Sequence, residues 1–333
     1  MNTSTISLFG HASSLKLTLF LFLILGVCVV SWHFVEFDWK NWLITLPLLL
    51  LALNLIGAIL TNPIFKYQIW LLVFHIGLLL LLLVVAIGQV TRLIGEVEVT
   101  EYSAYDSSIV KWQQGVFHSN RLDQLRFYLA DFSINYESIN GRAERMDTLT
   151  HLTWVDELGV TQKGVVGDEV PLELHGYELY TTHNKGFAPV FKWIPNKGQP
   201  VIGSVHLPAW PAFELNQASD LQVPGTPYRI WMNLKFDDVI LYNDKDSQFR
   251  VPKESVLVVR VGEERHELVA GKSIQFPTGR LEYLGLKTWM GFRIFYDWTL
   301  PWLLGAGLFA VFGLGLHFWK KYAPTPWLDE DKD

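Results

Sequence analysis

Four stretches of the sequence contain no Asp, Glu, Lys or Arg, and each is about as long as a helix that crosses a bilayer. They cover residues 18–35, 43–60, 69–90 and 299–319. A helix needs ~20 predominantly apolar residues to cross the hydrocarbon core of a membrane. We therefore expect four transmembrane helices, three near the N-terminus and one near the C-terminus. The composition agrees, because only 18% of the residues are charged, against about 25% in soluble domains.

The long block between the third and fourth spans has the pattern of a β-rich domain. Its apolar residues alternate or form short runs rich in Val, Ile, Thr and aromatic residues, and turn signals such as Asn140-Gly141, Asn184–Gly186 and Pro195–Gly198 separate them. The expected strands are residues 97–99, 127–134, 149–155, 172–180, 228–236, 255–261 and 280–286. Strands at this spacing are typical of antiparallel sheets packed as a sandwich or an open barrel.

The expected fold class is a membrane protein with four transmembrane α-helices, arranged three plus one, and a large extracytoplasmic, mostly antiparallel β domain. The expected divisions are an N-terminal membrane region at 1–93, the β domain at 94–296, the fourth helix at 297–320 and an acidic tail at 321–333.

The basic residues near the ends of the spans give the expected orientation. Four lie on the side of the termini: Lys16, Lys66, Lys320 and Lys321. Three lie on the side of the β block: Lys40, Arg92 and Arg293. Because cytoplasmic flanks carry the excess of Lys and Arg, both termini are expected in the cytoplasm and the β domain outside, in the periplasm of a bacterium. The first span has a competing interpretation as a cleaved signal peptide, but no A-x-A-like site follows it.

Cysteine and charge exclude several classes of function. The single cysteine, Cys28, lies in the first span and rules out an intrachain disulfide framework, a CxxC redox pair and a Cys-based zinc site. A net charge of −6 without a block of Lys or Arg gives no footprint for nucleic acid. The expected partners are the lipid bilayer, other proteins and a neutral or amphipathic ligand.

Two polar residues inside the spans, Asn54 and His75, are candidate functional residues, because polar groups at membrane depth are costly. Each lies six residues from the inner end of its span, about 9 Å deep at 1.5 Å per residue. The short connection between the two spans makes these helices neighbours, so a common polar site is expected.

Two interpretations of His75 remain open from the residues alone. A neutral imidazole could donate to Asn54 or to a backbone carbonyl and hold the helices in register. Alternatively, His75 is an axial ligand of haem iron, with Asn54 supporting it. His317 is a weaker candidate because it lies near the inner end of its span, so a second axial ligand is expected from another polypeptide. The remaining histidines of the β block are interpreted as surface or turn residues, with no zinc site among them: His118, His151, His175, His183, His206 and His266.

The layout resembles the ResB/CcsB family of cytochrome c biogenesis proteins, and local stretches follow the family in the same order. These stretches are Ser14–Thr18, Leu53-Asn54-Leu55, Phe74–Gly77, Leu129–Tyr136, His175–Tyr180, Gly186–Pro189 and Gly291–Asp297. The resemblance covers nearly the whole chain, although many members of the family are longer.

That resemblance implies a System II subunit that acts with a CcsA-type membrane partner. The pair would carry haem b from the inner side of the membrane to the outer face, where haem is attached to the CxxCH cysteines of an exported apocytochrome c. His75 matches the histidine that the family uses in an inner-side haem site. The partner's tryptophan-rich motif is missing from this sequence, which implies a subunit rather than a self-sufficient enzyme.

Two other classes of function are weighed against this one. One is a non-catalytic anchored β domain with a structural, sensory or protein-binding role, in which His75 and Asn54 only pack helices. The other is a small-molecule transporter, which is disfavoured because four spans without internal symmetry or broken polar helices offer little pathway.

Overall fold

The computed structural model describes residues 14–35, 39–119 and 122–323. The chain divides into two compact units. The first, here called the helical unit, comprises residues 1–93, 113–119 and 297–333, and the second, the β unit, comprises residues 94–112 and 120–296.

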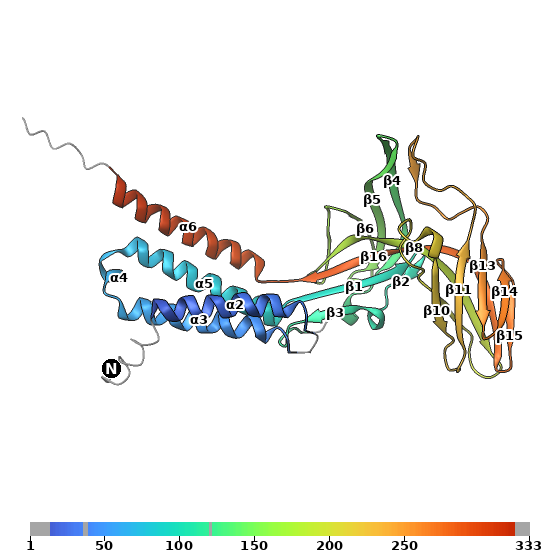
Figure 1. The fold of residues 1–333 in the computed structure, drawn as a ribbon, viewed down its shortest axis with the longest axis horizontal. Helices are drawn as coiled ribbons and strands as arrows, with labels where there is room; N and C mark the ends of the chain where they lie inside the picture. Colours follow the sequence, from blue (N-terminus) through green and yellow to red (C-terminus); the bar gives the residue numbers. More distant parts are fainter. Residues whose placement is uncertain (1–13, 36–38, 120–121, 324–333) are drawn as a thin grey trace, which may run out of the picture. The chain divides into compact units, whose positions relative to one another are not determined.

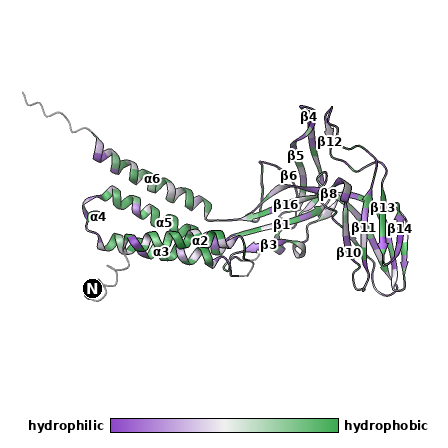
Figure 2. Cartoon of the chain, in the orientation of Figure 1, coloured by the Kyte–Doolittle hydropathy of each residue, from purple (hydrophilic) through white to green (hydrophobic). Residues whose placement is uncertain are grey.

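Within the residues that the structure describes, the helical unit contains four long helices, and all four are long and apolar enough to cross a membrane. They are α2 (Leu15–Trp32), α3 (Trp42–Thr61), α5 (Ile69–Thr91) and α6 (Leu300–Tyr322), with the short α4 (Ile64–Tyr67) between α3 and α5 (Figure 1). Figure 2 shows hydrophobic residues along all of them. The four expected spans are confirmed, with ends that differ from the charge-free windows by a few residues, and the chain is a membrane protein.

Small residues allow α5 and α6 to approach closely. A methyl group added at Gly77 would lie 2.6 Å from the Cα of Ala310, and one added at Gly313 would lie 2.7 Å from the backbone nitrogen of Phe74. Such contacts between backbones are typical of helices that associate inside a membrane. They fix the part of α5 that carries His75.

The β unit consists of three antiparallel sheets, which confirms the expected β domain. The seven-stranded sheet is built from β1 (Leu93–Thr100), β3 (Lys111–Gln114), β7 (Leu172–Leu174), β8 (Tyr177–Pro195), β9 (Val201–Ser204), β15 (Ser273–Phe276) and β16 (Gly279–Tyr296). Its strand order is β3-β1-β16-β8-β7, with β15 paired to β16 and β9 paired to β8.

The other two sheets have five and four strands. The five-stranded sheet contains β2 (Ser103–Ala104), β4 (Tyr128–Ile139), β5 (Arg142–Val155), β6 (Thr161–Gly167) and β12 (Ser247–Gln248). The four-stranded sheet contains β10 (Ala218–Gln222), β11 (Arg229–Lys235), β13 (Val256–Val261) and β14 (Glu264–Leu268). Short 3₁₀ turns lie at Ser107–Ile109, Leu122–Gln124 and Glu214–Asn216.

Two local expectations were wrong. The single strand expected at 172–180 is broken into β7 and β8 by a two-residue turn, in which His175 and Gly176 have φ of 51° and 80°. Positive φ at both positions is the pattern of a tight hairpin turn. Apolar residues alternate on each side of it, at 172 and 174 and then at 177 and 179, and the change of phase between them falls at the turn. The turn expected at Asn184–Gly186 instead lies inside β8.

An irregular bulge of three residues replaces that turn. Thr181 and Lys185 of β8 pair with Phe292 and Met290 of β16, so three residues of β8 face the single residue Gly291. Glycine is required there, because a methyl group at Gly291 would lie 2.4 Å from the Thr182 side-chain oxygen. Bulges of this kind redirect side chains beside functional sites, and here the bulged residues border a cavity described below.

Candidate functional site

His75 lies on α5 with its ring half-buried and packed against aromatic residues. Its ring centroid is 4.8 Å from that of Phe65 in α4 and 5.2 Å from that of Phe74, both in edge-on arrangements. The surroundings of the imidazole are therefore apolar, as expected for a group that meets an apolar macrocycle.

The hydrogen bond of His75 determines which of its nitrogens carries the proton. Nδ1 lies 2.7 Å from the carbonyl oxygen of Leu71, one turn earlier in α5. A carbonyl can only accept, so Nδ1 donates, and in the neutral ring Nε2 holds the lone pair. Within the described residues Nε2 has no hydrogen-bond partner. An imidazole oriented through one nitrogen with the other available is the usual state of a metal-ligating histidine.

Asn54 and His317, the other candidates, are placed differently. The buried Asn54 accepts a hydrogen bond of 2.7 Å from the hydroxyl of Thr18, which links α3 to α2. His317 lies near the end of α6, with its ring 5.5 Å from that of Phe318. His75 is thus the candidate whose ring is oriented by a hydrogen bond through one nitrogen and packed against two aromatic rings.

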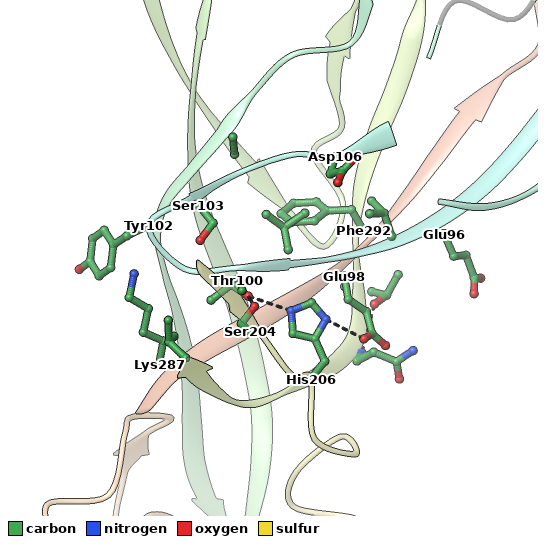
Figure 3. A pocket seen from close by; sticks show the side chains of 18 of the residues that line it. Glu96, Glu98, Thr100, Tyr102, Ser103, Asp106, Ser204, His206, Lys287 and Phe292 are labelled. Carbon is green, nitrogen blue, oxygen red and sulfur yellow. Dashed lines mark hydrogen bonds and ion pairs between the residues drawn. The ribbon is translucent and has the colours of Figure 1, made fainter. Parts of the chain in front are cut away.

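A cavity of about 710 Å³ in the β unit holds a second polar arrangement, centred on His206 (Figure 3). Its Nδ1 lies 3.0 Å from the carboxylate of Glu98, and its Nε2 lies 2.8 Å from the hydroxyl of Thr100. The Thr100 hydroxyl lies 2.6 Å from that of Ser204. In the neutral ring the carboxylate favours the proton on Nδ1, so that Nε2 accepts from the Thr100 hydroxyl, which in turn accepts from Ser204.

This chain of hydrogen bonds joins β1 to the segment that follows β9, although these strands are not neighbours in the sheet. Trp289 of β16 stacks on the His206 ring at 5.3 Å and donates from its indole nitrogen to the carbonyl of Leu207 at 3.1 Å. The expectation that His206 is a plain surface or turn residue missed this arrangement. A usable signal was the polar residues at alternate positions of an otherwise apolar strand, Glu96, Glu98 and Thr100.

Lys185, in the bulge of β8, is a buried cation with only 7% of its surface exposed. Its ammonium donates to the carbonyl of His183 at 3.3 Å and lies 5.8 Å from the Tyr136 ring. Arg145, which contacts Asp168 at 2.5 Å, adds a second positive charge nearby. Burial, followed by repulsion from Arg145, lowers the pKa of Lys185 to about 8.

This lowered pKa predicts how stability depends on pH. An unfolded lysine has a pKa of about 10.4, so between pH 8 and pH 10.4 the unfolded chain binds more protons than the folded one. The free energy of unfolding should therefore rise with pH across this window, by on the order of 3 kcal/mol relative to Lys185→Met, and the full penalty should be present below pH 8. Urea unfolding of the full chain at a series of pH values measures this. Lys192→Met on the same strand is the control, and its free energy of unfolding should rise with pH as that of wild type does. If the difference in free energy of unfolding between wild type and Lys185→Met does not change with pH, the prediction is wrong.

A comparison with protein families gave a match over part of the chain. Residues 68–209 match the model of the ResB-like family. The matched segment contains α5 with His75 and the β unit as far as His206, and it confirms the family resemblance seen in the sequence. A comparison with curated proteins gave no match.

Among solved structures, one similar chain is described as "Cytochrome c Heme Lyase CcmF", with 14% sequence identity and a TM-score of 0.28. The alignment covers 92% of this chain and 35% of that one. This chain therefore spans about a third of that relative's length, and a likeness at this level carries no argument about the site.

Proposed function

We propose that this membrane protein is a subunit that moves haem for cytochrome c maturation. The proposal starts from the match of residues 68–209 to the model of the ResB-like family. The subunit works with a CcsA-type partner in the bacterial inner membrane, with both termini in the cytoplasm and the β unit in the periplasm. Haem b is its cargo, and an exported apocytochrome c carrying CxxCH is the acceptor. The observation that carries the proposal is the available Nε2 of His75.

The residues around His75 fit an axial ligand of haem iron. Neutral imidazole is a common donor to haem, and the carbonyl of Leu71 holds the ring in the tautomer that leaves Nε2 free to coordinate. Phe65 and Phe74 supply apolar surface beside the ring. What the chain contributes is orientation of the ligand and exclusion of water.

The chain provides one ligand of a pair. Within the described helices, the histidines are His75 and His317, and the second lies near the end of α6. The other axial position is therefore assigned to the partner. Attachment requires the two thiols of CxxCH, and the single cysteine of this chain, Cys28, lies in α2. The thiol chemistry accordingly belongs to the apocytochrome, and this chain is a non-catalytic subunit of a synthetase complex.

Deletion of the gene tests the proposal in the cell. We expect the deletion strain to lose covalently bound haem from its exported c-type cytochromes, because haem no longer reaches the outer face, and the wild-type gene to restore it. Haem staining of membrane proteins separated under denaturing conditions measures the covalent product. An unchanged cytochrome c profile would contradict the proposal and favour a structural or sensory role for the β unit.

A further inference from the structure

Residues 113–119 follow the first strands of the β block in the sequence, but they belong to the helical unit. They comprise the end of β3 and the turn after it, and we call them the return loop. A methyl group added at Gly115 would lie 2.1 Å from the carbonyl carbon of Val90, so the loop packs directly on the backbone of the last turn of α5. The block expected to form the β domain therefore contains a segment that returns to the membrane-spanning helices.

Hydrogen bonds fix the return loop to the end of α5. The last carbonyl groups of a helix have no partner within the helix, and a carbonyl without a donor is costly inside a membrane. The backbone N–H of Phe117 donates to the carbonyl of Val90 at 2.8 Å. Nδ1 of His118 donates to the carbonyl of Thr91, also at 2.8 Å. The return loop thus supplies donors to the end of α5 and is held at the level of its last turn.

The contacts of Phe117 place the tip of the return loop where two spans meet the membrane surface. Its hydrogen-bond acceptor, Val90, lies in the last turn of α5, within the apolar run that ends at the charged Arg92. The ring of Phe117 also lies 6.4 Å from that of Trp42, the first residue of α3, in an edge-on arrangement. Phe117 is therefore at the depth at which α3 begins and α5 ends, whichever side of the membrane this end faces.

The tip of the return loop exposes apolar side chains and carries no charge. Residues 113–119 contain no Asp, Glu, Lys or Arg, and the adjacent Val116 and Phe117 are 44% and 68% exposed. Other exposed aromatic residues of the helical unit lie beside the same ends of the spans: Phe34, Trp39, Trp298 and Trp302. Aromatic residues gather in this way at the boundary between lipid and water. The surface that continues from the spans to the tip of the loop is therefore the lipid surface.

We propose that the return loop is a membrane-surface anchor, with the side chains of Val116 and Phe117 inserted among the lipid headgroups where α5 joins β1. The hydrogen bonds to α5 hold the loop at that level, and insertion removes the two apolar side chains from water. The anchor fixes how far the end of α5 stands out of the membrane, and with it the start of β1. It requires the helices to span the membrane, and it requires neither haem nor a partner protein.

Spin labels at single cysteines test the anchor directly. The chain has one cysteine, Cys28, so Cys28→Ser provides a background without thiols. Val116→Cys and Phe117→Cys are each made in that background and labelled with a nitroxide, and the full-length protein is reconstituted in vesicles of phosphatidylethanolamine and phosphatidylglycerol. Power saturation of the paramagnetic resonance signal compares collisions of the label with oxygen, which concentrates in lipid, and with a nickel chelate, which stays in water.

Three further sites calibrate the measurement. Leu158→Cys is the reference for water, because Leu158 is 88% exposed in the turn between β5 and β6. Val311→Cys is the reference for lipid, because Val311 is 68% exposed within α6. Gln113→Cys is the matched control in the return loop itself, because Gln113 is exposed and lies four residues before Phe117, farther from the end of α5.

We expect the ratio of oxygen to nickel collisions at positions 116 and 117 to exceed that of Leu158→Cys at least about threefold, and to stay below that of Val311→Cys, because headgroups are shallower than hydrocarbon. Gln113→Cys should give a lower ratio than both tip positions. Ratios at the two tip positions equal to that of Leu158→Cys would overturn the proposal by showing that the tip lies in water. Labels that neither reagent reaches would overturn it by showing that protein covers the tip.

Discussion

His75→Ala should remove the haem that, under the proposed function, co-purifies with this chain when it is expressed together with a CcsA-type protein. We expect haem content per complex to fall at least tenfold. Loss of residues that merely support metal ligands already costs 10–100-fold in affinity. The absorbance of the haem Soret band relative to protein measures the change.

The substitution should not unfold the helices. The carbonyl of Leu71, which accepts from Nδ1 of His75, is also the acceptor for the backbone N–H of residue 75 in a regular helix. Alanine therefore leaves no buried carbonyl without a donor. His317→Ala is the matched control, since it removes the other histidine of the described helices, and it should keep the haem. If the haem content of the His75→Ala complex equals that of wild type, His75 is not the haem ligand.

Trp289→Ala should strongly destabilise the β unit. The indole is 2% exposed, and truncation of a buried Phe or Trp to Ala costs roughly 3–5 kcal/mol through lost contacts and a residual cavity. The substitution also removes the donor to the carbonyl of Leu207 and the surface on which His206 stacks. We therefore expect the segment that follows β9 to lose its fixed position.

Urea unfolding of the full chain in detergent, followed by circular dichroism in the β-sheet region, measures this loss. Trp289→Phe is the control, because it retains an aromatic ring while it removes the indole donor and part of the ring volume, and it should cost less than Trp289→Ala. A midpoint for Trp289→Ala within error of wild type would show that the ring is not part of a cooperative core.

The four helices could be predicted because their signal is local. A charge-free run of the required length determines a span whatever the rest of the chain does, so 69–90 corresponds to α5 (Ile69–Thr91) almost residue for residue. The depth of a residue in the membrane likewise follows from its distance along the sequence to the end of its span. This calculation identified His75 as a candidate. Its orientation by the Leu71 carbonyl depends on a rotamer that no pattern of residue types reveals.

The cavity of the β unit could not be predicted, because its parts are brought together by non-local pairing. Thr100 and His206 are separated by 106 positions, and a period-two pattern gives the face of a strand but not its neighbours. Lys185 shows the same limit. Its flanking Asn184 and Gly186 indicate a turn, whereas the pairing of β8 with β16 places it buried inside a bulge.

Ligand replacement tests whether Nε2 of His75 binds the iron of the transported haem. In the complex of His75→Gly with the proposed CcsA-type partner, the missing ring leaves space that free imidazole can fill. We predict that imidazole restores the Soret absorbance of the purified variant complex to near the wild-type spectrum, and that it leaves His317→Gly unchanged. A His75→Gly complex with the wild-type spectrum before imidazole is added would contradict the claim.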